Sequence, residues 1–387
     1  MEIVKEKTSS DNNITEDVSA PKTKSKKFLI FTGIYTAIAI VLNLLAKIRS
    51  FSDFYTDHIF GLWSETYGRL TGLFPFSVGE IMIVAALILL LLAVVFSILL
   101  IFLRKKDNYK RFTVKYLKFI LITTITVFLI MTLNCNIPYS CSKLNLLQTE
   151  DKLYSSEDLA KVRKHIIEEC TSLAEKMERD ENGNIIFNGD ANAEVRKAMQ
   201  NISVDYPRFK GYYPQPKGIV GSYFMYQSNT IGVYFPFSME ANYNTYLSTS
   251  YYPTTTAHEL AHLKGYMFEN EANFFAFLAC TNSDCDYIKY SGYLGVLYYI
   301  DNDYYNGVTD KMYMEQIQIP DIVRFDDHCY ETETVIELEN KEPIVQDDVV
   351  ESINETITDT YMDFYNVTPN YSEVTYLILQ YYDGTLF

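Results

Sequence analysis

The chain has 387 residues, of which 48% are hydrophobic, and a formal net charge of −16. The charge is unevenly distributed, because the first 134 residues carry a net +6 and the remaining residues a net −22. An acidic segment of that size repels phosphate, so we expect no nucleic-acid partner. The length allows two domains, each with a core of its own.

Three charge-free apolar runs occupy residues 28–46, 81–103 and 119–133. The first two are long enough to cross a hydrocarbon layer of about 30 Å as helices, and the shorter third run spans it if flanking side chains snorkel. The sequence therefore predicts a three-span transmembrane region at 28–134, with a lipid bilayer as partner. The polar residues 1–27 before it are expected to form a disordered cytoplasmic tail.

Basic residues predict the orientation of these spans. They gather before the first span and between the second and third, at Lys22, Lys24, Lys26, Lys27, Arg104, Lys105, Lys106, Lys110, Arg111, Lys115 and Lys118. Loops rich in Lys and Arg stay in the cytoplasm. Three crossings then place residues 135–387 outside the cytoplasm, as one extracytoplasmic domain of a multi-pass membrane protein.

All six cysteines lie in that outward region, where disulfides are permitted. Cys135 with Cys141, and Cys280 with Cys285, are local candidates for bridges. Buried free thiols are an equally good interpretation, and the spacing does not choose between them.

The outward region is expected to be a helix-rich α+β domain. Apolar residues recur at helical spacing over 155–177, and further helices are predicted at about 193–202 and 372–382. Residues 218–237 contain short aromatic and β-branched runs around a turn, which predict a small antiparallel sheet.

The candidate metal-binding and catalytic residues lie in the segment HELAHLKG at 258–265. His258 and His262 are four residues apart, so on a helix they stand on one face and can share a zinc ion. Glu259 is then positioned to act as general base toward the water in the open position. Threonines at 254–256 offer a helix cap, and Gly265 offers a stop.

A catalytic zinc site has three protein ligands as a rule. Glu271 is the predicted third ligand, as the first residue of a second helix that follows the Gly265 turn and runs to about Cys280. Glu269 competes for this role, and one sequence does not exclude it.

Together with ENEANFFAFLAC at 269–280, this motif resembles the gluzincin type of zinc site, in which a Glu on the following helix completes the metal sphere. ImmA/IrrE-type metallopeptidases also carry a Glu-Ala-Asn-type motif at this place. Nearly the whole chain is similar to a family of bacterial three-span membrane proteins of uncharacterised function with an outward HExxH domain. That similarity includes FPFSVGE at 74–80 and PFSMEANYN at 236–244. The resemblance implies a zincin-like domain anchored in the membrane.

The segment PFSMEANYN ends the predicted sheet shortly before the metal helix. Edge strands near a catalytic metal bind substrate backbone in many zinc peptidases, so Glu240, Asn242 and Asn244 are candidate substrate-binding residues. A turn with no binding role explains the segment equally well. His328, Arg324, Tyr293 and several other tyrosines are candidates for stabilising the oxyanion, and the sequence singles out none of them.

These features predict a membrane-anchored zinc metallopeptidase that hydrolyses a peptide or protein substrate outside the cytoplasm. The alternative is a zinc-stabilised extracytoplasmic binding or sensing domain without catalysis. An intramembrane protease is disfavoured because the motif lies in polar surroundings, more than 120 residues beyond the last span.

Overall fold

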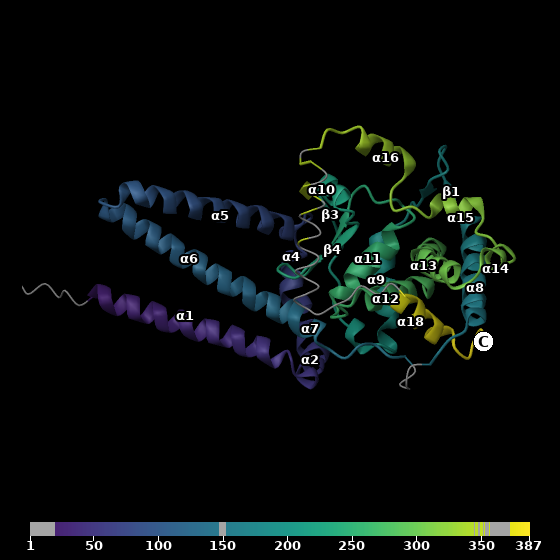
Figure 1. Cartoon of the computed structure of the whole chain (residues 1–387), viewed down its shortest axis with the longest axis horizontal. Helices are drawn as coiled ribbons and strands as arrows, with labels where there is room; N and C mark the ends of the chain where they lie inside the picture. The colour runs from purple at the N-terminus through teal and green to yellow at the C-terminus, as the bar shows by residue number, and fades with distance from the viewer. Residues whose placement is uncertain are drawn as a thin grey trace, which may run out of the picture.

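The structure is a computed structural model that describes residues 20–146, 152–343 and 372–387, together with residues 345, 346, 349, 350, 352 and 356. Three long helices extend from one side of a helix-rich globular body (Figure 1). Of the predicted disordered tail, residues 1–19 lie outside the described residues. Residues 20–27 instead form the first turns of helix α1.

The three long helices are α1 (Ala20–Leu45), α5 (Val78–Leu103) and α6 (Asp107–Met131). The last continues through the π-helical segment η3 (Thr132–Asn136) into α7 (Ile137–Tyr139). Segments 26–45, 78–103 and 107–139 are long and apolar enough to cross a membrane. In the most apolar window of α5 no side chain is buried. Such bare apolar surface is typical of helices that face lipid.

The segment between the first two long helices is itself helical. It consists of α2 (Arg49–Tyr55), η1 (Thr56–Phe60), α3 (Gly61–Trp63), η2 (Ser64–Gly68) and α4 (Arg69–Thr71), of which η1 and η2 are π-helical. Tyr55 and Phe60 from this segment share a buried cluster with Met239, Leu263 and Met267 of the globular body. The boundary predicted at residue 134 therefore divides segments that share a core.

Helices make up most of the globular body. They are α8 (Ser156–Ala174), α9 (Ala191–Asn201), α10 (Ser222–Gln227), α11 (Tyr252–His262), α12 (Glu269–Thr281), α13 (Asp286–Gly307), α14 (Asp310–Met314), α15 (Asp321–Asp326), α16 (Thr332–Glu339) and α18 (Ser372–Tyr382), with 3-10 turns η4 (Ile202–Val204) and η5 (Pro207–Phe209). The main core lies between α8, α9, α11, α12, α13 and α18. The predicted helices at 155–177, 193–202 and 372–382 are confirmed, since their apolar stripes face this core.

Two small sheets occur among the described residues. One pairs β1 (Glu178–Arg179) with β2 (Ile185–Ile186). The other has the order β3-β5-β4, in which β5 (Glu240–Asn244) lies parallel to β3 (Lys217–Ile219) and antiparallel to β4 (Gly232–Phe235).

The prediction of an antiparallel sheet over residues 218–237 is only partly right. Strands occur at both ends of that range, but Ser222–Gln227 form helix α10, and β3 and β5 are parallel. Short aromatic runs carry no periodicity that separates a strand from a buried helical turn.

The six cysteines all fall within the described residues, and all are free thiols. The two local bridges are therefore absent from the structure, and the interpretation as buried or half-buried free thiols is the one that holds.

Candidate metal centre

Helix α11 carries both histidines and ends at a sharp turn. It begins at Tyr252 with Pro253 in its first turn, so the threonines at 254–256 lie inside the helix rather than at its cap. After His262 the chain reverses at Gly265, whose φ is +91°. A Cβ at this position would lie 2.6 Å from Thr56 Cγ2. Glycine is required twice, for the backbone conformation and for the close approach of η1.

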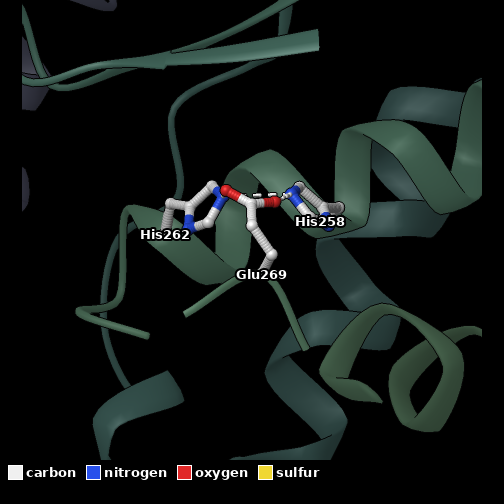
Figure 2. A group of neighbouring side chains, drawn as sticks. All are labelled: His258, His262 and Glu269. Carbon is white, nitrogen blue, oxygen red and sulfur yellow. Dashed lines mark hydrogen bonds and ion pairs between the residues drawn. The ribbon is translucent and has the colours of Figure 1, made fainter. Parts of the chain in front are cut away.

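This reversal brings Glu269, the first residue of α12, back over the two histidines. The Nε2 atoms of His258 and His262 are 3.0 Å apart. Glu269 Oε2 lies 3.1 Å from His258 Nε2, and Glu269 Oε1 lies 3.7 Å from His262 Nε2. Figure 2 shows the Glu269 carboxylate between the two imidazole rings. Three potential metal ligands thus converge on one point.

Both imidazoles are held by hydrogen bonds at their other nitrogen. His258 Nδ1 lies 2.7 Å from Asn273 Oδ1, and His262 Nδ1 lies 2.8 Å from the carbonyl oxygen of Tyr266. Since both partners are oxygen acceptors, each Nδ1 donates its proton. In the neutral rings both Nε2 atoms then present lone pairs to each other and to a carboxylate. Such a set is stable only with a cation or a proton at its centre.

The separations suit a small divalent ion. Ligand atoms at about 2.1 Å from a tetrahedral zinc lie about 3.4 Å from one another. The three observed distances of 3.0, 3.1 and 3.7 Å bracket that value. Two imidazoles and one carboxylate are also a ligand set that zinc accepts in catalytic sites. The residues present therefore fit a zinc ion.

The electrostatics of the cluster reflect its need for one positive charge. Burial alone would lower the pKa of His258, but the hydrogen bond and charge of Glu269 outweigh it and raise the pKa to about 9. Burial lowers the pKa of His262 to about 4 against the opposing charge of Glu269. The Glu269 side chain is 67% exposed. Desolvation of its carboxylate between the two imidazoles would raise the pKa of Glu269, yet the two histidines hold it at about 2. One proton is therefore held among the three side chains, in the place that a bound metal ion would take.

Glu259 is buried beside the ligands and against strand β4. Burial raises the pKa of its carboxyl group to about 8, against the opposing effects of His258 and of the Tyr234 backbone amide. The strand passes so close that a Cβ on Gly232 would lie 2.5 Å from Glu259 Oε1. A buried carboxyl group with a raised pKa next to a ligand cluster is suited to take up a proton near neutral pH.

The structure does not bring Glu271, the predicted third ligand, to the two histidines. Its Oε1 accepts a hydrogen bond of 2.7 Å from the backbone amide of Leu144, and burial raises its pKa to about 7. Helix α12 begins at Glu269 and not at Glu271. Residues two apart on a helix point about 200° apart, so only one of the two acids can face the histidines.

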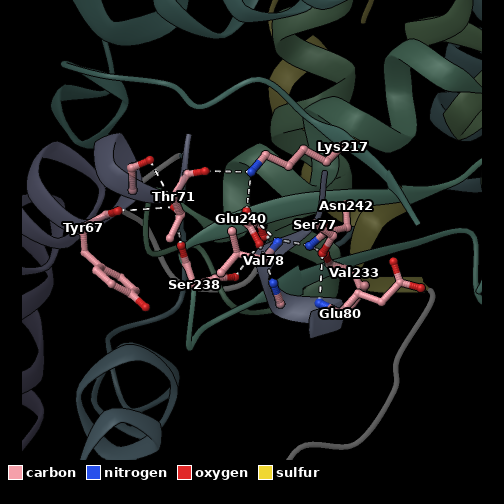
Figure 3. Close-up of polar contacts among 12 residues, drawn as sticks. Tyr67, Thr71, Ser77, Val78, Glu80, Lys217, Val233, Ser238, Glu240 and Asn242 are labelled. Atoms are coloured by element: carbon pink, nitrogen blue, oxygen red, sulfur yellow. Dashed lines mark hydrogen bonds and ion pairs between the residues drawn. The ribbon is translucent and has the colours of Figure 1, made fainter. Parts of the chain in front are cut away.

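The proposed substrate-binding residues also lie elsewhere. Glu240 is buried in an ion pair with Lys217 and accepts hydrogen bonds from the amides of Val78 and Gly79, at 3.2 and 2.8 Å. Figure 3 shows this group, which ties β5 to the start of α5. Asn242 and Asn244 are buried too, with side-chain amides that donate to backbone carbonyls. In the structure all three residues have packing roles.

A cavity of about 1020 Å³ adjoins the cluster. Strand β4 forms one wall, and Tyr298, Tyr299 and Asp327 lie on other walls. The sequence does not single out these residues, because tyrosine is frequent throughout the chain and no local pattern separates β4 from β5. His328 does line the cavity. Of the other oxyanion candidates, Tyr293 is a core residue, and Arg324 donates to the carbonyl oxygen of Ile319.

Comparison with known proteins places the chain in a family. No curated protein and no solved structure matches it. The family model of DUF3810, described as a protein of unknown function, matches residues 55–379. That range runs from the segment between the first two long helices to α18 and includes the whole ligand cluster. Because the match extends over more than half of the sequence, the chain belongs to the DUF3810 family.

Proposed function

We propose that the chain is a membrane-anchored, zinc-dependent metallopeptidase whose metal ligands are His258, His262 and Glu269. One observation carries the proposal. Two imidazole nitrogens and a carboxylate converge within 4.8 Å of one another while hydrogen bonds at Nδ1 aim both Nε2 lone pairs at the same point. Metal-binding histidines are oriented in this way.

Three protein ligands beside a large cavity favour catalysis over a structural role for the metal. Structural zinc sites are closed by four protein ligands, whereas catalytic sites keep a position open. Zinc bound here would supply a Lewis acid and lower the pKa of a water molecule in that position. The proposal assigns to Glu259 the role of general base, because its buried carboxyl group lies next to His258 with a raised pKa.

Strand β4 is the proposed binding edge for the substrate backbone. Among the described residues it pairs on one side only, with β5, and its four residues line the cavity. A peptide that adds to this edge runs past Glu259, which Gly232 contacts. The proposed substrate-binding group is therefore the β4 backbone, and not the side chains of Glu240, Asn242 and Asn244.

The membrane anchor and orientation belong to the same proposal. Exposed apolar side chains along α1, α5 and α6 support insertion in a bilayer. The basic residues at the far ends of α5 and α6 support an outward position for the globular body.

Metal content separates the two possible third ligands. We expect the purified full chain to contain about one zinc per molecule, with nitrogen and oxygen ligands in X-ray absorption spectra. Glu269→Gln should weaken zinc binding by at least tenfold, whereas its matched control Glu271→Gln should keep the metal, because that side chain accepts a hydrogen bond from Leu144 and does not face the two histidines. Equal zinc loss in both variants would contradict the ligand assignment.

Turnover separates a peptidase from a zinc-stabilised binding domain. Glu259→Gln should retain zinc and the melting temperature of the wild type while its hydrolysis of a peptide library falls at least a hundredfold, since the base is removed. If the zinc-loaded wild type cleaves no peptide in such a library, the non-catalytic alternative is favoured.

A further inference from the structure

We propose that the substrate is itself anchored in the bilayer, and that its segment next to the membrane enters the cavity along β4. This inference rests on the peptidase function proposed above and names the class of substrate. It follows from where the cavity begins, how β4 is attached to the membrane helices, and how long β4 is.

One end of the cavity is built from the third long helix. Met131 in α6, Cys135 in η3 and Tyr139 in α7 line the cavity that also contains His258 and Glu259. All three belong to the continuous segment 107–139 that is long and apolar enough to cross a membrane. The cavity therefore extends from the ligand cluster to the end of a candidate span.

The end of β4 is fixed to the same helix ends. Asn134 Nδ2 donates a hydrogen bond of 2.8 Å to the carbonyl oxygen of Pro236. The ring of Phe235 packs on the first turn of α5 so closely that a Cβ on Gly79 would lie 2.5 Å from Phe235 Cδ1. Phe235, Pro236 and Phe237 all line the cavity. This wall is attached to both α5 and α6 and keeps its position relative to them.

The bilayer surface lies at this level. The end of α1 joins α6 here, where Asn43 Nδ2 donates to Thr132 Oγ1 at 3.2 Å. Leu73, Phe74 and Phe76, just before α5, are exposed apolar side chains, with 78% of Leu73 accessible. Exposed apolar side chains next to a candidate span are typical of a surface in contact with lipid. A peptide that leaves the bilayer beside α5 and α6 thus meets the cavity at once.

The length of β4 gives the distance from the bilayer surface to Glu259. Phe235 packs on α5, and Gly232 packs on Glu259. Three residues of strand correspond to about 10 Å. A substrate strand paired with β4 would therefore place its scissile bond about three to five residues from the point where it leaves the bilayer. An anchored peptide also gains in effective concentration over a soluble one.

The first experiment compares one peptide with and without an anchor. The full chain, loaded with zinc, is reconstituted in phosphatidylcholine vesicles and given a peptide that is either free or palmitoylated. We expect at least tenfold higher kcat/KM for the anchored form. When Gly-Ser residues are inserted after the anchor, cleavage should stay at a constant distance from the bilayer and move in the sequence. Equal rates for both peptides, with cleavage that follows the sequence, would overturn the inference and leave the peptidase function standing.

The second experiment measures binding without turnover. Glu259→Gln in the same vesicles is photo-crosslinked to the anchored peptide, and labels are expected in residues 131–139 and 232–237. Phe237→Asp should reduce labelling at least fivefold, whereas Phe224→Asp, at an exposed aromatic side chain that does not line the cavity, is the control. Labels in the expected residues without hydrolysis by wild type would support the binding mode and refute the peptidase. A photoactivatable phosphatidylcholine that labels these residues while the peptide does not would identify a lipid site and overturn the inference.

Discussion

Gly232 and Glu259 touch where the β4 backbone passes the proposed base. In Gly232→Ala the new Cβ would lie 2.5 Å from Glu259 Oε1 and 3.0 Å from its Cδ, so the carboxylate must move away. We expect kcat to fall at least tenfold, because a general base acts only within hydrogen-bond reach of its proton. The metal ligands do not include Gly232, so zinc content should not change.

The control for this variant is Gly307→Ala, where no atom lies within 4 Å of the added Cβ. Its peptide hydrolysis and zinc content should equal those of the wild type. A Gly232→Ala protein with unchanged kcat would show that Glu259 is not the base, or that β4 shifts to admit the methyl group without moving the carboxylate.

At the scale of elements, the ion pair of Lys217 and Glu240 joins the sheet to the start of α5. Both side chains are buried. Lys217 Nζ also donates a hydrogen bond of 2.9 Å to the carbonyl oxygen of Thr71 in α4. In Lys217→Met a buried carboxylate loses its counter-charge. The free energy of unfolding should fall by about 3–5 kcal/mol, measured by chemical denaturation in detergent.

A matched change at an exposed lysine provides the reference. Lys311→Met removes an ion pair with Glu315 whose lysine is 84% exposed, and should alter the free energy of unfolding by less than about 0.5 kcal/mol. Similar stability of the two variants would mean that the buried pair does not hold the sheet to the membrane helices.

The elements differ in how well the sequence predicts them. Helices α8 and α18 follow from apolar residues at helical spacing, which is a local property. Strand β3 pairs in parallel with β5 across more than twenty residues, and no local pattern encodes that pairing. Helix α10 lies inside a run that favours a strand, because packing against β5 decides its conformation.

The candidate site was predictable to a similar degree. The spacing of His258 and His262 places two ligands on one face of a helix without any tertiary information. The third ligand depends on the angle at which the chain returns after Gly265, and that angle is set by contact with Thr56 and Phe60. From the sequence, Glu271 is therefore predicted with Glu269 as its competitor, and it is Glu269 that the structure brings to the two histidines.

At the scale of the whole molecule, the globular body depends on residues that precede it. Tyr55 and Phe60 lie in the buried cluster with Met239, Leu263 and Met267. A fragment of residues 135–387 would expose that apolar surface to water. We expect the fragment to aggregate and lack near-ultraviolet circular dichroism, whereas the full chain in detergent unfolds in one cooperative transition. A soluble, monomeric fragment with native dichroism would contradict this view.

The contact of Gly265 with Thr56 also has a consequence for how the protein is made. The turn that carries Glu269 to the histidines closes against η1, which is synthesised about two hundred residues earlier. Both segments must emerge on the same side of the membrane before the ligands can meet. Two candidate spans, α5 and α6, separate these segments. A nascent chain in which only one of the two crosses the membrane therefore leaves η1 and the turn on opposite sides and cannot assemble the cluster, whichever way the first helix is inserted.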